Sequence, residues 1–247
     1  MRGIGMLFWV EFKLYLRNPW AAFFVLAYPL MLVLFFGSLY GNRPDPRTGL
    51  GVLDLAIPGY LVLIAATVGM ISLPIHLAVY RERRILRRLA VTPVAPLALL
   101  LAEGLALFAL TASGTVLMVL AASHLYGLHL RGSPLAVALA FALVALALFA
   151  FGFLLAGLST SARMAQGVSF LLFFPTLFLS GAGFPQELLT ESLRRLAAPL
   201  PTTQAVTLLR GLWRGEALTG HLKEVLVLLA VFALSALLSG PLFRREG

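Results

Sequence analysis

Long apolar runs separated by short polar segments dominate the sequence. Six of the runs contain about 20 residues or more, the length that a helix rising about 1.5 Å per residue needs to cross a hydrocarbon layer of about 30 Å. We therefore expect an all-α, polytopic membrane protein in which residues 1–247 form a single transmembrane domain. The six expected membrane spans are residues 20–40, 56–79, 97–126, 134–158, 165–184 and 225–243.

The composition agrees with this pattern. Hydrophobic residues make up 60% of the chain and charged residues 12%, whereas soluble domains have about 45–50% and about 25%. The excess apolar surface must face lipid, which excludes a soluble enzyme. The absence of cysteine excludes disulfides, thiolate metal sites and cysteine nucleophiles. The histidines, which show no metal-ligand spacing, are His76, His124, His129 and His221.

The basic residues predict the orientation of the chain in the membrane. The net charge is +9, but the charges lie between the apolar runs rather than on one basic surface, so they indicate topology rather than nucleic-acid binding. Placing most of the lysines and arginines on the cytoplasmic side puts both termini there. We expect a multi-pass protein of the plasma (inner) membrane.

Two segments outside the spans are expected to form shorter helices. Residues 1–19 predict an interfacial, amphipathic helix, because their aromatic side chains suit the headgroup region. Residues 185–222 predict external re-entrant half-helices, the first with a favourable i, i+4 pair of Glu191 and Arg195. Such half-helices are tolerated at membrane depth only where protein or water satisfies their backbone.

The most informative polar segment is residues 80–93, which reads YRERRILRRLAVTP. On a helix counted from Arg81, the arginines share one face, while Glu82 lies within the apolar face and lacks a charged partner. One interpretation is that the arginines anchor to phosphate headgroups and hold the flanking spans in register. The other is that the helix docks into a groove of a cytoplasmic partner. The pattern alone leaves both open.

A family resemblance bears on this choice. The string RERRILRRLAVTPV, followed by an apolar span, resembles the cytoplasmic coupling segment of type 2 permeases of ABC transporters, which include daunorubicin-type drug exporters. The string FLSGAGFPQELLTESLRRLAAPLPTTQAVTLLRG, residues 178–211, resembles the end of the fifth span and the external re-entrant helices of that family. Thr190 and Gln204 depart from the family pattern, which often has a proline and an aromatic residue at these positions.

The resemblance implies a non-enzymatic permease subunit of an exporter, paired with a second copy or a similar permease. Its cargo would be hydrophobic or amphiphilic, such as a drug, lipid or glycolipid. ATP and Mg would be bound by a separate ATPase subunit, and this chain would hold no cofactor or metal. The sequence contains no GxxxxGK[ST] phosphate loop, which agrees with that division of labour.

The resemblance also assigns residues to three regions. The contacts to the ATPase subunit would be Arg81, Glu82, Arg83, Arg84, Arg87, Arg88, Leu89, Thr92 and Pro93. The substrate path would include Thr67, Met70, Phe173, Phe174 and Phe178. The external re-entrant region would include Gly181, Phe184, Pro185, Pro201 and Arg210.

A few polar residues inside the spans complete the predictions. Glu103 lies about two turns from the cytoplasmic end of its span, which favours a structural or gating contact, with the basic helix as one partner, over a midplane proton carrier. His76 is expected at the interface or hydrogen-bonded between helices. An ion-coupled secondary transporter would need midplane carboxylates and often duplicated halves, and neither is evident. A non-catalytic membrane scaffold stays open from composition alone.

Overall fold

The computed structural model describes residues 2–46, 49–85, 88, 96–183 and 189–244, and all regular structure in these ranges is helical. The N-terminal half contains α1 (Arg2–Arg17), α2 (Pro19–Ala22), η1 (Phe23–Ala27), α3 (Tyr28–Tyr40), α4 (Val52–Thr67), η2 (Val68–Ser72), α5 (Leu73–Glu82) and α7 (Pro96–Tyr126). The C-terminal half contains α8 (Pro134–Leu158), α9 (Ala162–Leu179), α10 (Glu191–Ala197), α11 (Pro201–Trp213), η4 (Leu218–His221) and α12 (Leu222–Arg244).

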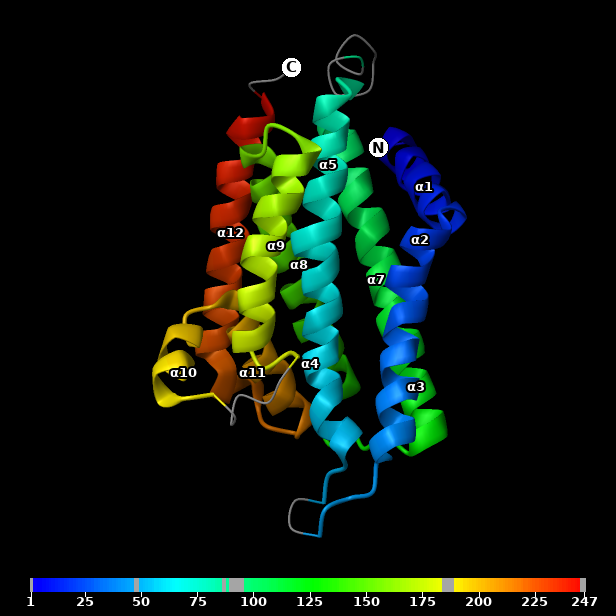
Figure 1. Cartoon of the computed structure of the whole chain (residues 1–247), viewed down its shortest axis with the longest axis vertical. Coiled ribbons are helices and arrows are strands. Elements are labelled where there is room, and N and C mark those ends of the chain that lie inside the picture. The colour runs from blue at the N-terminus through cyan, green and yellow to red at the C-terminus, as the bar shows by residue number, and fades with distance from the viewer. Residues whose placement is uncertain (1, 47–48, 86–87, 89–95, 184–188, 245–247) are drawn as a thin grey trace.

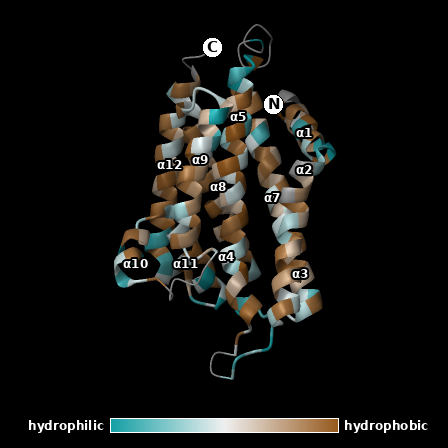
Figure 2. Cartoon of the chain, in the orientation of Figure 1, coloured by the Kyte–Doolittle hydropathy of each residue, from teal (hydrophilic) through white to brown (hydrophobic). Residues whose placement is uncertain are grey.

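Five helical stretches in the described residues are long and apolar enough to cross a membrane. They run over Val52–Glu82, Leu97–Tyr126, Pro134–Leu158, Ala162–Leu179 and Leu218–Phe243. Each matches one of the last five predicted spans, so the chain is a multi-pass membrane protein. The apolar helix Val25–Tyr40, within the predicted first span, is shorter. Figure 2 shows hydrophobic residues along the lengths of these helices.

The long helices run side by side, and the shorter ones lie at the two ends of the bundle (Figure 1). The N-terminal helix α1 packs against α7 at the end that also holds the last turns of α5 and α12. At the opposite end are α10 and α11. Helix α8 packs against α4, η2, α5 and α12, and therefore forms the centre of the bundle.

Glycines allow the central helices to approach backbone to backbone. A Cβ atom on Gly152 of α8 would lie 1.9 Å from the carbonyl oxygen of Gly69 in η2. A Cβ on Gly69 would lie 2.9 Å from the carbonyl oxygen of Leu148. Ala156, one turn beyond Gly152, is fully buried. Gly152 and Ala156, which are four residues apart, therefore form a site of close helix packing within the chain.

Two of the apolar helical stretches contain a π-helical turn next to a proline. Segment η1 precedes Pro29, and segment η2 precedes Pro74. A proline inside a helix removes one backbone hydrogen bond and crowds the preceding turn, and a widened turn relieves that crowding. The stretch Val52–Glu82 is consequently one continuous helical span although Pro58 and Pro74 lie within it.

Candidate functional site

The chain after α5, residues 83–93, is called the basic segment below, and it begins with a break in the helix. Helix α5 ends at Glu82, Arg83 is its C-cap, and Arg84 has a φ of 54°. A left-handed φ in a residue other than glycine is uncommon and cannot continue an α-helix. The helical face counted from Arg81 is therefore wrong, because Arg81 and Glu82 belong to the end of the span. Arg83, Arg84 and Arg88 are exposed. The predicted contacts Arg87, Leu89, Thr92 and Pro93 lie outside the described residues.

Arg81 binds the C-terminal end of the central helix α8. Its guanidinium Nη1 donates to the carbonyl oxygens of Ala156, Gly157 and Ser159 at 2.5, 2.8 and 2.9 Å. The last carbonyls of a helix have no partner within the helix and form the negative end of its dipole. Arg81 satisfies these carbonyls and places its positive charge where the dipole favours it.

Glu82 makes the complementary contact to the next helix. Its Oε2 accepts a hydrogen bond from the backbone N–H of Ala162, the first residue of α9, at 3.1 Å. Free N–H groups and the positive end of the dipole favour a carboxylate at this position. The partner that Glu82 lacks in the sequence pattern therefore lies within the chain. Two consecutive residues of α5 fix the end of α8 and the start of α9.

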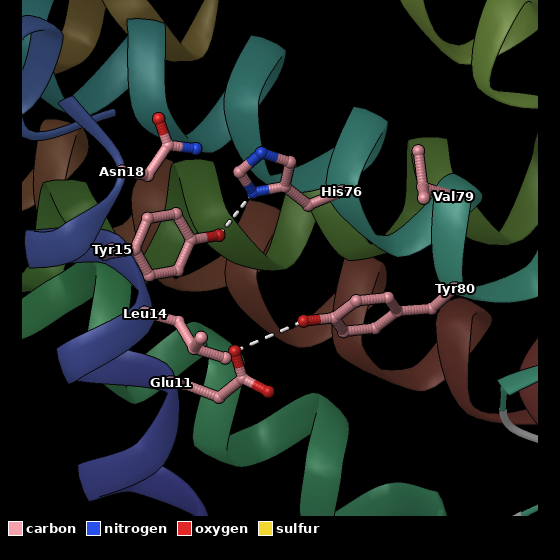
Figure 3. A pocket seen from close by; sticks show the side chains of 7 residues that line it. All are labelled: Glu11, Leu14, Tyr15, Asn18, His76, Val79 and Tyr80. Carbon is pink, nitrogen blue, oxygen red and sulfur yellow. Dashed lines mark hydrogen bonds between the residues drawn. The ribbon is translucent and has the colours of Figure 1, made fainter. Parts of the chain in front are cut away.

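A second polar cluster joins α1 to α5 and α7, and we call it the α1 junction: Glu11, Tyr15, His76, Tyr80 and Glu103. The carboxylate of Glu103 is fully buried, and the hydroxyl of Tyr15 donates to it. Its Oε1 lies 3.4 Å from Nδ1 of His76, which also contacts the Tyr15 hydroxyl. The Tyr80 hydroxyl donates to Glu11 Oε2 at 3.2 Å (Figure 3).

The α1 junction corrects one prediction and confirms another. The structural contact predicted for Glu103 exists, but in the described residues its partners come from α1 and α5 rather than from the basic segment. His76 is hydrogen-bonded between helices, as expected. The roles of Glu11 and Tyr15 were missed. The available signal was their i, i+4 spacing, which places both on one face of the N-terminal helix.

The electrostatics of the α1 junction favour protonation. Burial, followed by the negative charge of Glu103, raises the pKa of Glu11 to about 7. Burial and the same carboxylate raise the pKa of Tyr15 above its ordinary value, so its hydroxyl stays protonated and remains a donor. At neutral pH the junction therefore lies close to the midpoint of a proton-binding equilibrium at Glu11.

At the end of the bundle opposite to the α1 junction, Asp54 forms hydrogen bonds to three segments that connect or border the spans. It is 1% exposed and accepts hydrogen bonds from Nδ2 of Asn42 at 3.0 Å and from the backbone N–H of His129 at 2.7 Å. The backbone N–H of Gly51 donates to its other oxygen at 2.8 Å. Sequence reasoning missed this residue, because the predicted second span began at residue 56 and left Asp54 outside it.

The predicted re-entrant region is only partly brought together. The Nη2 atom of Arg210 donates to the carbonyl oxygen of Gly181 at 2.9 Å, and Gly181 has a φ of 86°. Pro201 begins α11, which packs against α4, α8 and α12. The predicted pair of Arg195 and Glu191 forms. Phe184 and Pro185 lie outside the described residues.

The residues predicted to line the substrate path do not share one surface in the single chain. Met70 and Phe173 are buried, and the Thr67 hydroxyl donates to the carbonyl oxygen of Leu63 at 2.8 Å. Phe174 and Phe178 are 48% and 49% exposed on α9. Thr67 is partly buried, so of the five residues only Phe174 and Phe178 are exposed in the single chain.

Comparison with known proteins identifies the family. The family model described as "ABC-2 type transporter" matches residues 2–212, from α1 to the last turn of α11. A comparison with the curated proteins gives no match. The family match covers most of the chain and includes both polar clusters at the α5 end of the bundle. The chain therefore belongs to the ABC-2 type transporter family, whose members are the transmembrane permease subunits of ABC transporters.

Proposed function

We propose that the chain is the permease subunit of an ABC exporter and that its ATPase partner docks at the α5 end of the bundle. This partner binds ATP and Mg, and its conformational cycle drives the permease between two states. The exposed Arg83, Arg84 and Arg88 contact it directly. The family membership and the absence of a phosphate loop in the sequence support this division between the two subunits.

The observation that carries this proposal is the pair of contacts made by Arg81 and Glu82. Both residues immediately precede the basic segment and bind two other spans, α8 and α9. A force applied to the basic segment therefore reaches three spans through directional hydrogen bonds. Arg81 and Glu82 act in this mechanism as positioning residues, which transmit the movement of the docked segment.

The α1 junction extends the connection to α7. The N-terminal helix packs along α7, and its Glu11 and Tyr15 reach both α5 and α7. An ATPase subunit that contacts α1 as well as the basic segment would thus move four spans as one group. The predicted interfacial position of α1 agrees with its exposed Trp9, since indole rings suit the headgroup region.

The proposed topology places the α5 end in the cytoplasm of a plasma (inner) membrane. Most lysines and arginines then lie inside, with both termini. The chain crosses the membrane six times, and residues 20–40 form the first crossing. The segment 185–222 is external, and its helix α11 re-enters the membrane beside α4, α8 and α12.

Helix α9 supports pairing with a second copy or with a similar permease. Exposed residues recur along it at alternating spacings of three and four, the spacing of a seam between two helices. These residues are Met164, Gly167, Leu171, Phe174 and Phe178. The two phenylalanines from each copy would offer apolar and aromatic surface to a hydrophobic or amphiphilic substrate such as a drug, lipid or glycolipid. Thr67, Met70 and Phe173 would join this path once the helices separate.

The test is transport by the complex of permease and ATPase subunit in proteoliposomes. We expect Glu82→Ala to leave ATP hydrolysis in place and to abolish ATP-dependent movement of a lipophilic dye, because the hydrogen bond between the end of α5 and the first residue of α9 is lost. Arg88→Ala should weaken copurification of the ATPase subunit. Arg214→Ala removes the same charge from an exposed residue directly after α11, and should change neither property. Unchanged transport by Glu82→Ala would contradict the proposal.

A further inference from the structure

The α1 junction borders a cavity that the transport proposal does not use. The cavity has a volume of about 200 Å³ and lies between α1 and α5 (Figure 3). A water molecule takes about 30 Å³ in the liquid, so several waters or one small organic group would fit. Its polar lining consists of Glu11, Tyr15, Asn18, His76 and Tyr80, and two aliphatic side chains complete it.

The charges around the cavity do not balance. Glu11 and Glu103 belong to one hydrogen-bonded cluster, and none of the lysines and arginines that the structure describes pairs with either carboxylate. Lys13, on the same helix as Glu11, lies instead over the ring of Trp9, 5.1 Å from its centroid. Glu11 and Glu103 are both buried, and two buried carboxylates without a lysine or arginine partner are unfavourable when both are charged. A proton or a mobile cation must therefore supply the missing positive charge.

We propose that this cavity binds an ammonium group, presented by a free amine or by the headgroup of an amine lipid such as phosphatidylethanolamine. The Glu11 carboxylate forms the ion pair, and ammonium N–H groups donate strong hydrogen bonds to it. Tyr15 and Tyr80 place two aromatic rings in the lining, and such rings attract cations through their faces. The site shares residues with the transport proposal, but ligand binding can be measured on this chain alone, because the lining comes only from α1, α5 and the residue that follows α1.

The cavity is also accessible from the surface on which a lipid would lie. Leu14, at its lining, is 55% exposed, and the side chain of His76 is 37% exposed. Trp9 and Leu14 expose apolar surface on the same helix, beside which an acyl chain would pack. A lipid whose headgroup amine binds Glu11 would thus anchor α1 in the membrane and would contact α1 and α5 at the same site.

Ammonium binding must compete with the proton on Glu11. With the pKa of Glu11 at about 7, the carboxyl is mostly neutral at pH 6 and mostly charged at pH 8. The apparent affinity for an ammonium ion should therefore rise by about tenfold between these pH values. The groups that face Glu11 are Tyr15 from α1, His76 and Tyr80 from α5, and Glu103 from α7.

The test uses the purified full-length chain and two forms of the ligand. Isothermal titration calorimetry with ethanolamine should show an apparent affinity about tenfold higher at pH 8 than at pH 6. Native mass spectrometry should show that the protein retains phosphatidylethanolamine in preference to phosphatidylglycerol. Ethanolamine binding without lipid retention assigns the site to a free amine. Retention of the lipid alone assigns it to a headgroup.

The variant Glu11→Gln keeps the shape of the side chain and removes its charge, so it should weaken binding at pH 8 by tenfold or more. Tyr80→Phe retains the ring and should weaken binding only a few-fold. Glu191→Gln, at an exposed carboxylate of α10, is the matched control and should bind as the wild type does. The proposal is overturned if neither ligand binds at pH 8, if affinity is equal at both pH values, or if Glu11→Gln binds normally.

Discussion

Replacement of Arg81 tests the most specific contact at the α5 end. Arg81→Ala removes the Nη1 donor, which lies 2.5, 2.8 and 2.9 Å from three carbonyl oxygens at the end of α8. Hydrogen bonds to a charged group contribute about 1.5–3 kcal/mol. The favourable position of a cation at a helix C-terminus adds about 0.3–1 kcal/mol. The contact between α5 and α8 should therefore be weakened by about 2–4 kcal/mol. This corresponds to about 30-fold to 1,000-fold in a local opening equilibrium, at about 1.4 kcal/mol per factor of ten.

The absence of cysteine in the chain makes this equilibrium measurable. Ser159 is 1% exposed, and its carbonyl oxygen is one of the three acceptors. A Ser159→Cys reporter should react with a maleimide only when the region opens, because the side chain is otherwise shielded. Arg81→Ala in this background should raise the labelling rate at least 30-fold. Arg81→Lys, which retains the charge without the guanidinium geometry, should give an intermediate rate.

The neighbouring Arg83 offers a matched control. It is exposed and directly follows the helix, so Arg83→Ala makes the same change of charge one turn or less from the contact. With Arg83→Ala added, the Ser159→Cys reporter should be labelled at the same rate as in the protein that carries Ser159→Cys alone. If Arg81→Ala also labels at that rate, the hydrogen bonds to α8 do not hold the two helices together and the reasoning fails.

Three further predictions concern the packing and the α1 junction. Gly152→Val should lower the thermal stability strongly, since even a Cβ would lie 1.9 Å from a carbonyl oxygen; Gly240→Val, which meets nothing within 4 Å, should not. Tyr15→Phe should cost about 1–3 kcal/mol by leaving buried Glu103 without this donor, measured by chemical unfolding in detergent. Because the raised pKa of Glu11 lets the folded state bind more protons between pH 4.5 and about 7, stability should fall as pH rises through this range, and Glu11→Gln should remove that slope.

The spans were predictable because length and hydrophobicity determine them locally. The predicted span 134–158 coincides with α8, where a serine cap and Pro134 mark the start in the sequence itself. The end of α5 was not predictable in this way. The left-handed conformation falls on Arg84, where no glycine or asparagine signals it. The helical face counted through this break consequently assigned Arg81 and Glu82 to the wrong element.

The polar clusters were harder to predict because their members are distant in sequence. Arg81 and Ala156 are 75 residues apart, and Tyr15 and Glu103 are 88 residues apart. A buried carboxylate such as Glu103 predicts that a partner exists, but only the packing of α1 on α7 identifies it. The requirement for a partner is thus a property of the sequence, and the identity of the partner is a property of the fold.

The central claim, that the α5 end is the cytoplasmic face on which the ATPase subunit docks, can be tested by single-cysteine labelling at Arg88. The exposed Glu216 serves as the reporter for the opposite end, because it lies just beyond α11. With a membrane-impermeant maleimide, Arg88→Cys should react in inside-out vesicles and become protected when the ATPase subunit is added. Glu216→Cys should react in right-side-out vesicles and be unaffected by that subunit. Reaction of Arg88→Cys from the outside, or no protection by the bound ATPase subunit, would contradict the account.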